Sequence, residues 1–210
     1  MLKRTASACI AVVAVMTLPA AGYVGVSDPC PVPTPYPPPG APWGIVNNPN
    51  MEGGFTNGGA NQWIAWKDPV WTSQIHYAGT DRKYDGSYSQ KLVFPQPPRD
   101  ESEAGIYQQI YVVPGASYTV TAQIQVSFAP QTYNGEDLLA WLGVDPFGQA
   151  SGDGYGMVWS TAVATQNTWI TKSVTVTAVF PVMTVGLKGT RKWPQHGDGA
   201  QVWFDHVTIS

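Results

Sequence analysis

The stretch SYTVTAQIQVSF, residues 117–128, alternates strictly between apolar and polar side chains over its whole length. Side chains two residues apart lie on the same face of a β-strand, so this period predicts a long strand with one buried face. The face expected to be buried consists of Tyr118, Val120, Ala122, Ile124, Val126 and Phe128. A strand of this kind restricts the chain to folds that cover one side of a sheet.

Turn residues and shorter alternating stretches extend this expectation to the rest of the chain. Pro114-Gly115 predicts a turn between residues 117–128 and a strand at 104–112, and we expect those two strands to pair as an antiparallel hairpin. No segment keeps a 3.6-residue period. Further strands are expected at Tyr88–Phe94, Leu138–Val144, Met157–Ser160, Trp169–Ala178, Met183–Lys188 and Val202–Ile209. Many short strands joined by Gly, Pro and Asn turns favour an all-β fold, a two-sheet antiparallel β-sandwich.

The beginning of the chain has the pattern of a secretory signal peptide. Lys3 and Arg4 precede an apolar run at 8–18, which is too short to span a bilayer, and small residues follow it. We therefore expect residues 1–22 to be a signal peptide and residues 23–42 to be a Pro-rich linker. The folded domain is expected at 43–210, and no membrane span is expected in the mature form.

Charge and cysteine usage narrow the range of partners. Loss of residues 1–22 removes two of the 11 Lys and Arg residues and none of the 14 acidic residues, which gives a mature net charge of −5. A mildly acidic chain without a basic run argues against nucleic acid and anionic membranes. Cys30 is the one cysteine left after cleavage, so it can only pair with another chain or stay a free thiol.

Four stretches together resemble the calcium-containing jelly-roll carbohydrate-binding modules of the family 4, 9 and 22 type. In chain order they are NNPNMEGGF (47–55), YDGSYSQKL (84–92), IYQQIYVVPGASYTV (106–120) and VWFDHVTI (202–209). Two positions depart from the family pattern: Met51 stands where Phe is usual, and His206 replaces a second Asp. The resemblance covers residues 45–210 and implies a galactose-binding-domain-like jelly roll that binds glycans.

The last of these stretches contains a carboxylate, Asp205, among apolar residues, where an unpaired buried charge is costly. In the family that it resembles, a structural Ca²⁺ is held by the opening Glu, the closing Asp and backbone carbonyls. The matching residues here are Glu52 and Asp205, with carbonyls expected from Lys83–Ser87, and calcium prefers such oxygen ligands. Alternatively, Asp205 pairs with a Lys or Arg, or lies at a solvated strand end.

Sugar binding requires aromatic rings that stack on C–H faces, together with amides and carboxylates that bond hydroxyls. In the strand at 104–112, Tyr107, Gln109 and Tyr111 share the face opposite the apolar side chains. The expected hairpin partner adds Gln123 to the same surface. Alternatively, these aromatic residues are present because they favour strands, with no role in binding.

Three tryptophans are further candidates for carbohydrate binding. We expect Trp63 to pack in the core and Trp66 to line the rim of the site. Trp141 alternates with apolar neighbours and therefore faces the polar surface. Trp193 lies in a Gly/Pro-bounded loop beside cationic residues, where it either stacks on a sugar or plugs the end of the sandwich.

Catalysis is not expected, because no hydrolase, metalloprotease or phosphate-loop motif occurs. A glycosidase requires two carboxylates across a cleft. The candidates fall in expected loops or strand ends without a supporting motif: Glu101, Glu103, Glu136, Asp137 and Asp145. The sequence thus predicts a secreted, non-catalytic module that binds poly- or oligosaccharide, either released or associated with the cell surface. The alternative is a structural or adhesive cell-surface subunit of the same fold without glycan binding.

Overall fold

The computed structural model describes residues 43–70, 72–95, 101–128, 137–192 and 199–210. These residues form twelve β-strands, and no helix occurs among them. Accordingly, the described part of the chain has no helix long and apolar enough to cross a membrane. The architecture is all-β, as the period-two patterns predict.

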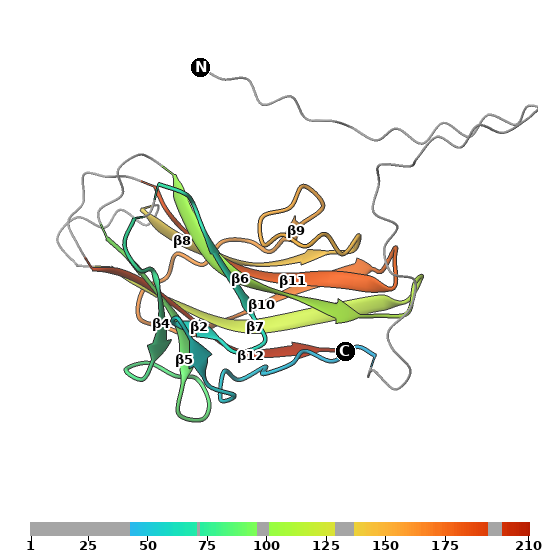
Figure 1. The fold of residues 1–210 in the computed structure, drawn as a ribbon, viewed down its shortest axis with the longest axis horizontal. Helices are drawn as coiled ribbons and strands as arrows, with labels where there is room; N and C mark the ends of the chain where they lie inside the picture. The colour runs from blue at the N-terminus through green and yellow to red at the C-terminus, as the bar shows by residue number, and fades with distance from the viewer. Residues whose placement is uncertain (1–42, 71, 96–100, 129–136, 193–198) are drawn as a thin grey trace, which may run out of the picture. The chain divides into compact units, whose positions relative to one another are not determined.

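Ten of the strands form two antiparallel five-stranded sheets, which lie as separate layers in Figure 1. The first sheet has the order β10-β7-β12-β5-β4: Ile170–Thr177, Ser117–Ser127, Ala200–Ile209, Ser89–Phe94 and His76–Gly79. The second sheet has the order β3-β6-β11-β8-β9: Ile64–Lys67, Ser102–Tyr111, Val182–Arg191, Leu138–Asp145 and Val158–Trp159. A short pair, β1 (Phe55–Thr56) and β2 (Gly59–Ala60), precedes β3.

The core lies between the sheets and follows the alternation of the strands. In β7, Val120, Ile124 and Val126 are fully buried, as the pattern at 117–128 predicts. At one core position the second sheet has Gly189, where a Cβ would lie 2.9 Å from the Phe94 ring of the first sheet. The missing side chain leaves the room that the phenyl ring fills.

The predicted hairpin between residues 104–112 and 117–128 is wrong. β6 pairs with β11 and β3 in the second sheet, whereas β7 pairs with β10 and β12 in the first. The turn at Pro114-Gly115 therefore carries the chain from one sheet to the other. A turn-forming pair of residues fits either connection, and hydrogen bonds to strands much later in the chain decide between them.

The last strand does not keep a single alternation. Its register against β7 shifts between Asp205 and Thr208, and His206 adopts a left-handed conformation with φ of 49°. This β-bulge adds one residue to β12. As a result Phe204 and Val207 both face the core, and Asp205 faces outward beneath the turn that follows β4.

The segment before β1 is attached to the second sheet by a buried amide. Gln108 accepts a hydrogen bond from the Asn47 N–H (2.7 Å) and donates to the Asn47 and Gln62 carbonyls. Gln108 thus serves as a satisfied polar group in the interior, 4% exposed. Trp63 is 6% exposed and packs in the core, as expected.

Candidate functional site: an outer tryptophan face and a carboxylate-bound turn

Two of the predicted sugar-binding residues lie in one row across the outer surface of the second sheet. Trp66 of β3 is opposite Gly105 of β6, Gly105 is opposite Lys188 of β11, and Lys188 is opposite Trp141 of β8. Neighbouring strands are about 4.8 Å apart, so the two indole-bearing positions are about 14 Å apart. Both tryptophans are half-buried, and the Nε1 edge of the Trp66 ring lies against Gly152, where a Cβ would collide with it.

A third indole on this surface was not predicted. Trp159 of β9 is opposite Gly143 of β8, and its ring lies over that glycine, where a Cβ would collide with it. In the same way, a Cβ on Gly105 would lie 2.9 Å from Nε1 of Trp66. These glycines let the indoles approach the sheet closely. The signal in the sequence is weak, because β9 is only two residues long.

The charged groups on this surface hold one another in place. Lys188 Nζ lies 4.5 Å from the centroid of the Trp159 ring and 5.2 Å from that of Trp141, within cation–π range of both. The same ammonium lies 2.9 Å from Glu103 Oε1, which also accepts a hydrogen bond from Thr190. We call Trp66, Trp141, Trp159, Lys188 and Glu103 the tryptophan face. It combines ring surfaces with fixed donors and acceptors.

The loop after β8, residues 146–157, folds over the neighbouring part of the same sheet. Tyr107 donates its hydroxyl to the Ala150 carbonyl (3.2 Å), and the Gln109 side chain donates to the Gly148 carbonyl (2.7 Å). Asp145, fully buried, accepts backbone N–H groups at the start of the loop. The polar groups of Tyr107 and Gln109 thus bind this loop, and both residues stay predictions as sugar ligands, together with half-buried Tyr111.

Gln123 does not lie on the surface that the sequence predicts. Because β6 and β7 belong to different sheets, Gln123 faces outward from the first sheet, is 8% exposed, and bonds Thr171 of β10. The assignment of Gln123 to the Tyr107 surface is therefore wrong. Trp193 lies outside the described residues.

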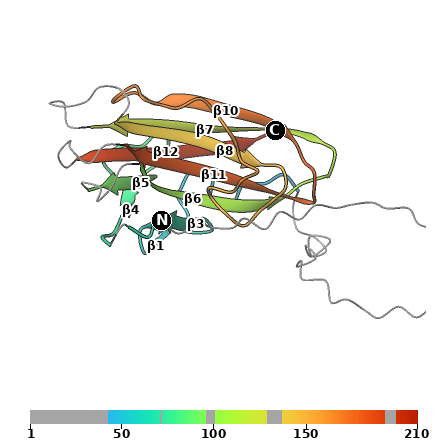
Figure 2. The same cartoon turned by 90° about the horizontal axis from the view of Figure 1, so that it is seen from above.

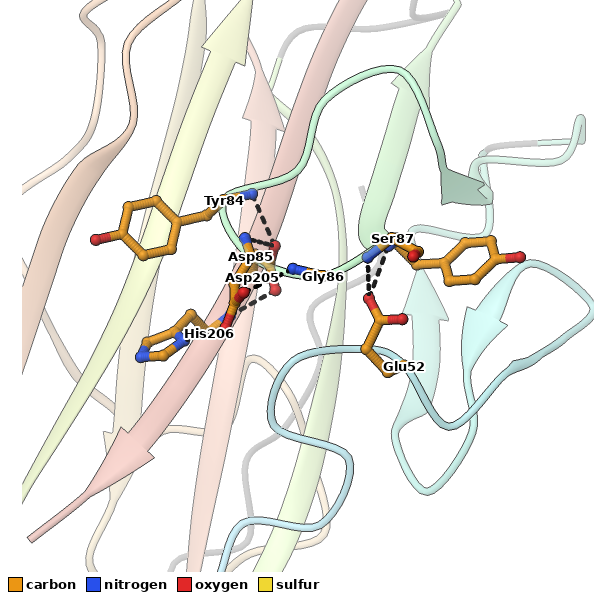
Figure 3. A network of polar contacts seen from close by, with 8 residues as sticks. Glu52, Tyr84, Asp85, Gly86, Ser87, Asp205 and His206 are labelled. Carbon is orange, nitrogen blue, oxygen red and sulfur yellow. Dashed lines mark hydrogen bonds and ion pairs between the residues drawn. The ribbon is translucent and has the colours of Figure 1, made fainter.

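The predicted metal ligands, Glu52 and Asp205, lie on either side of a turn at residues 84–88 (Figure 3). Asp205 Oδ2 accepts hydrogen bonds from the backbone N–H groups of Tyr84 (2.9 Å) and Asp85 (3.2 Å). Its Oδ1 accepts one from the N–H of His206, at 2.7 Å. Asp205 is fully buried, so it does not lie at a solvated strand end. Its partners are backbone N–H groups of this turn and of the bulge rather than a Lys or Arg.

Glu52 binds the other half of the turn. Its Oε1 accepts hydrogen bonds from the N–H groups of Ser87 (2.7 Å) and Tyr88 (2.8 Å). Gly86, with φ of 66°, brings the backbone close to this carboxylate, where a side chain would collide with it. The first segment of the domain and its last strand are therefore joined through one turn, as the family resemblance implies for the two ends of the domain.

Burial raises the pKa of Asp205 above its ordinary value. The N–H groups of Asp85, Tyr84 and His206 oppose this shift, since they stabilise the charged form, and the nearby Asp85 carboxylate adds to it. The net direction shows that the carboxylate pays a desolvation cost that its hydrogen bonds only partly offset.

These contacts can be compared with the ligands that the predicted calcium ion would need. The groups that face Glu52 and Asp205 are N–H donors, whereas calcium prefers six to eight oxygen ligands. Within the described ranges, no three His, Cys, Asp or Glu side chains are placed to hold a metal. The backbone N–H groups thus bind the two carboxylates directly, and an N–H group cannot serve as a ligand for a cation. An ion at Glu52 and Asp205 requires oxygen ligands beyond these contacts, and it stays a prediction.

The comparisons with known proteins identify the fold. No protein-family model matches the chain, and no curated protein matches it. Among solved structures, TmCBM61, determined in complex with β-1,4-galactotriose, aligns over 79% of this chain and 96% of its own, with 12% identity and a TM-score of 0.53. The enzymatically active domain of Bacteriophage CBA120 tailspike protein 4 also gives a TM-score of 0.53, at 11% identity, over 79% of this chain but 21% of its own.

A xylan-binding domain from carbohydrate-binding module family 22 gives a lower TM-score, 0.46, at 16% identity, over 77% of this chain and 90% of its own. The likeness to TmCBM61 and to the tailspike domain establishes the fold, a two-sheet antiparallel β-sandwich. The fold that the resemblance implies is thus confirmed.

Proposed function

We propose that this protein is a secreted, non-catalytic module that binds poly- or oligosaccharide on its tryptophan face. The observation that carries the proposal is the placement of Trp66, Trp141 and Trp159 on the outer surface of one sheet, with Lys188 against the rings of Trp141 and Trp159. Sugar rings present apolar C–H faces that stack on indoles, and their hydroxyls need donors and acceptors beside those faces.

The charged groups of the tryptophan face suit a neutral ligand. Lys188 and Glu103 neutralise each other at 2.9 Å, and their side chains are 15% and 29% exposed. They can still offer hydrogen bonds to hydroxyl groups, since an ammonium has three donors and a carboxylate several acceptor sites. The exposed sugar hydroxyls would remain partly hydrated, so we expect modest affinity.

The carboxylates near this face support binding rather than cleavage. Asp145 is fully buried and accepts two backbone N–H groups of its own loop. Glu103 is bound to Lys188 and Thr190. A glycosidase needs two carboxyl groups about 5–10 Å apart, free to act on opposite sides of a glycosidic bond. Neither of these two residues is placed in that way.

Retention of the purified protein on insoluble polysaccharides tests the proposal. TmCBM61 was determined with a β-1,4-galactotriose ligand and the family 22 domain is described as xylan-binding, so β-1,4-galactan and xylan are the first probes, with cellulose as a third. We expect wild-type protein to be retained on at least one probe. Trp141→Ala should weaken that retention about tenfold, which corresponds to about 1.4 kcal/mol of stacking.

The matched control is Trp43→Ala, because Trp43 is 41% exposed and lies outside the tryptophan face. It should bind like the wild type. Equal weakening by both substitutions, or no retention on any probe, would overturn the proposal. Concentration-dependent assembly seen by light scattering, without retention, would instead favour the structural or adhesive alternative. Release of reducing sugar from a bound probe would contradict the non-catalytic assignment.

A further inference from the structure

The first sheet carries a second outer surface that the tryptophan face does not use. β10 and β7 lie side by side at the edge of this sheet (Figure 2), and their inward side chains, such as Val120, Val174 and Val176, are buried in the core. Their outward side chains are mainly hydroxyl-bearing. We call this surface the hydroxyl face, and it consists of Thr119, Thr121, Thr171, Ser173, Thr175, Thr177 and, from β12, Thr208.

The hydroxyl face carries no charge, although most of it is open to solvent. All four of its β10 members are exposed, and the face has no Asp, Glu, Lys or Arg. Solvent-exposed sheet surfaces and edge strands ordinarily carry charges, which keep them soluble and prevent pairing with other chains. The one lysine of β10, Lys172, belongs to the opposite face of the strand and donates a hydrogen bond to the Thr161 hydroxyl. An uncharged, polar surface of this kind is complementary to a neutral, hydroxyl-rich partner.

Bonds between the side chains hold the hydroxyls in a regular array. Thr119 bonds Thr175 across the strands at 2.9 Å, and Thr121 bonds Thr208. Outward residues recur about every 6.8 Å along a strand and about every 4.8 Å between strands. A hydroxyl engaged in one bond keeps further donor or acceptor capacity, so such pairs can still bind a ligand hydroxyl.

An aromatic cluster lies at one end of this array. Tyr84, 49% exposed, contacts Trp169 with ring centroids 6.0 Å apart and His206 at 5.6 Å. Trp169 directly precedes β10, and His206 is the bulge residue of β12. The backbone of Tyr84 is held by Asp205, as Figure 3 shows, so the carboxylate-bound turn positions the central ring of the cluster.

We propose that the hydroxyl face and the Tyr84–Trp169–His206 cluster form a second binding surface for a neutral polysaccharide chain. The rings would stack on sugar at one end, and the Thr and Ser hydroxyls would bond successive residues along β10. This surface lies on the first sheet, whereas the tryptophan face lies on the second. One molecule would therefore bind two glycan chains and bridge them. The ligand class rests on the proposed function, but the site is separate.

The test places charge on this surface in two backgrounds. Ser173→Lys/Thr175→Lys introduces two ammonium groups at exposed positions, where long side chains are accommodated without repacking the core. The matched control, Thr72→Lys/Ser73→Lys, adds the same charge at exposed positions outside the face. Both pairs are made in the wild type and in Trp66→Ala/Trp141→Ala, and unchanged thermal unfolding verifies their folding. Retention is measured on β-1,4-galactan, xylan and cellulose, and bridging by the turbidity of soluble galactan and xylan.

We expect Trp66→Ala/Trp141→Ala to keep some retention. Adding Ser173→Lys/Thr175→Lys should reduce this residual retention at least fivefold, while the control pair leaves it unchanged. In the wild type, the charged pair should abolish turbidity but leave retention through the tryptophan face. Loss of all retention in Trp66→Ala/Trp141→Ala, or equal turbidity with and without the charged pair, would overturn the second surface alone. Absence of wild-type retention on all three probes would overturn both proposals.

Discussion

Replacing Asp205 by asparagine should lower the free energy of unfolding by about 2 kcal/mol, because the amide cannot reproduce the acceptor geometry of the carboxylate. Oδ2 accepts the N–H groups of Tyr84 and Asp85, and Oδ1 accepts that of His206. In either orientation of the amide, its NH₂ group meets at least one of these N–H donors. That donor is then buried without a partner.

Two opposing effects set the magnitude. A buried N–H left without an acceptor costs about 1–3 kcal/mol, and the remaining hydrogen bonds lose their charge-assisted strength. Against this, the neutral amide avoids part of the desolvation cost that raises the pKa of Asp205. The mispaired donors should dominate, since both carboxylate oxygens are engaged. A loss of about 2 kcal/mol corresponds to a decrease in Tm of about 5 °C for a domain of this size.

Urea unfolding followed by tryptophan fluorescence measures the change, with Asp153→Asn as the matched control. Asp153 is exposed and accepts a hydrogen bond from the hydroxyl of Ser151 within its own loop, so its substitution should change stability by less than about 0.5 kcal/mol. If Asp205→Asn proved as stable as the control variant, the backbone of the turn would not depend on this carboxylate.

The remaining predictions concern metal removal and pH. The calcium ion inferred from the resemblance predicts that EDTA lowers the wild-type Tm by several degrees and that added calcium restores it, whereas an unchanged Tm would leave the N–H groups as the partners of Glu52 and Asp205. Burial lowers the pKa of His76 below 6.5; the Gly105 carbonyl opposes this shift and Lys67 adds to it. A depressed folded pKa means that the unfolded chain binds the proton more readily, so the contribution of neutral His76 is fully present above about pH 6.5 and is lost as the pH falls below it. The urea midpoint should fall less between pH 7, 6 and 5 for His76→Gln than for the wild type. An equal fall in both proteins would show that His76 does not contribute to the pH dependence of stability.

Much of the fold could be predicted because alternation reports directly on burial. The pattern at 117–128 became β7 with its apolar face in the core, and the outward placement of Trp141 followed from its apolar neighbours. Pairing could not be predicted in the same way. The residues at 114–115 form a turn whether the next strand stays in the same sheet or crosses to the other. Gln123 was assigned to the wrong surface for this reason.

The site was predicted in part for a related reason. Trp66 and Trp141 were identified from local patterns, but their common row depends on the register of β3, β6, β11 and β8, which contacts distant in sequence determine. Trp159 was missed because two residues do not establish a period. The left-handed conformation of His206 was not predicted either: histidine is enriched among residues with positive φ, but that enrichment does not single out one position within a strand.

The loop at residues 146–157 has a consequence for how specificity can change in this protein. Its first part, residues 147–150, is attached to the sheet by a few side chains, Tyr107, Gln109 and Asp145, while Tyr155 further along is fully exposed. An exchange of residues 153–155 keeps these attachments, as well as Gly152 against Trp66 and Gly156 against Asp145, and would reshape the border of the proposed ligand surface while leaving the strands intact. New preferences could then arise by grafting a single segment, without a penalty to the scaffold.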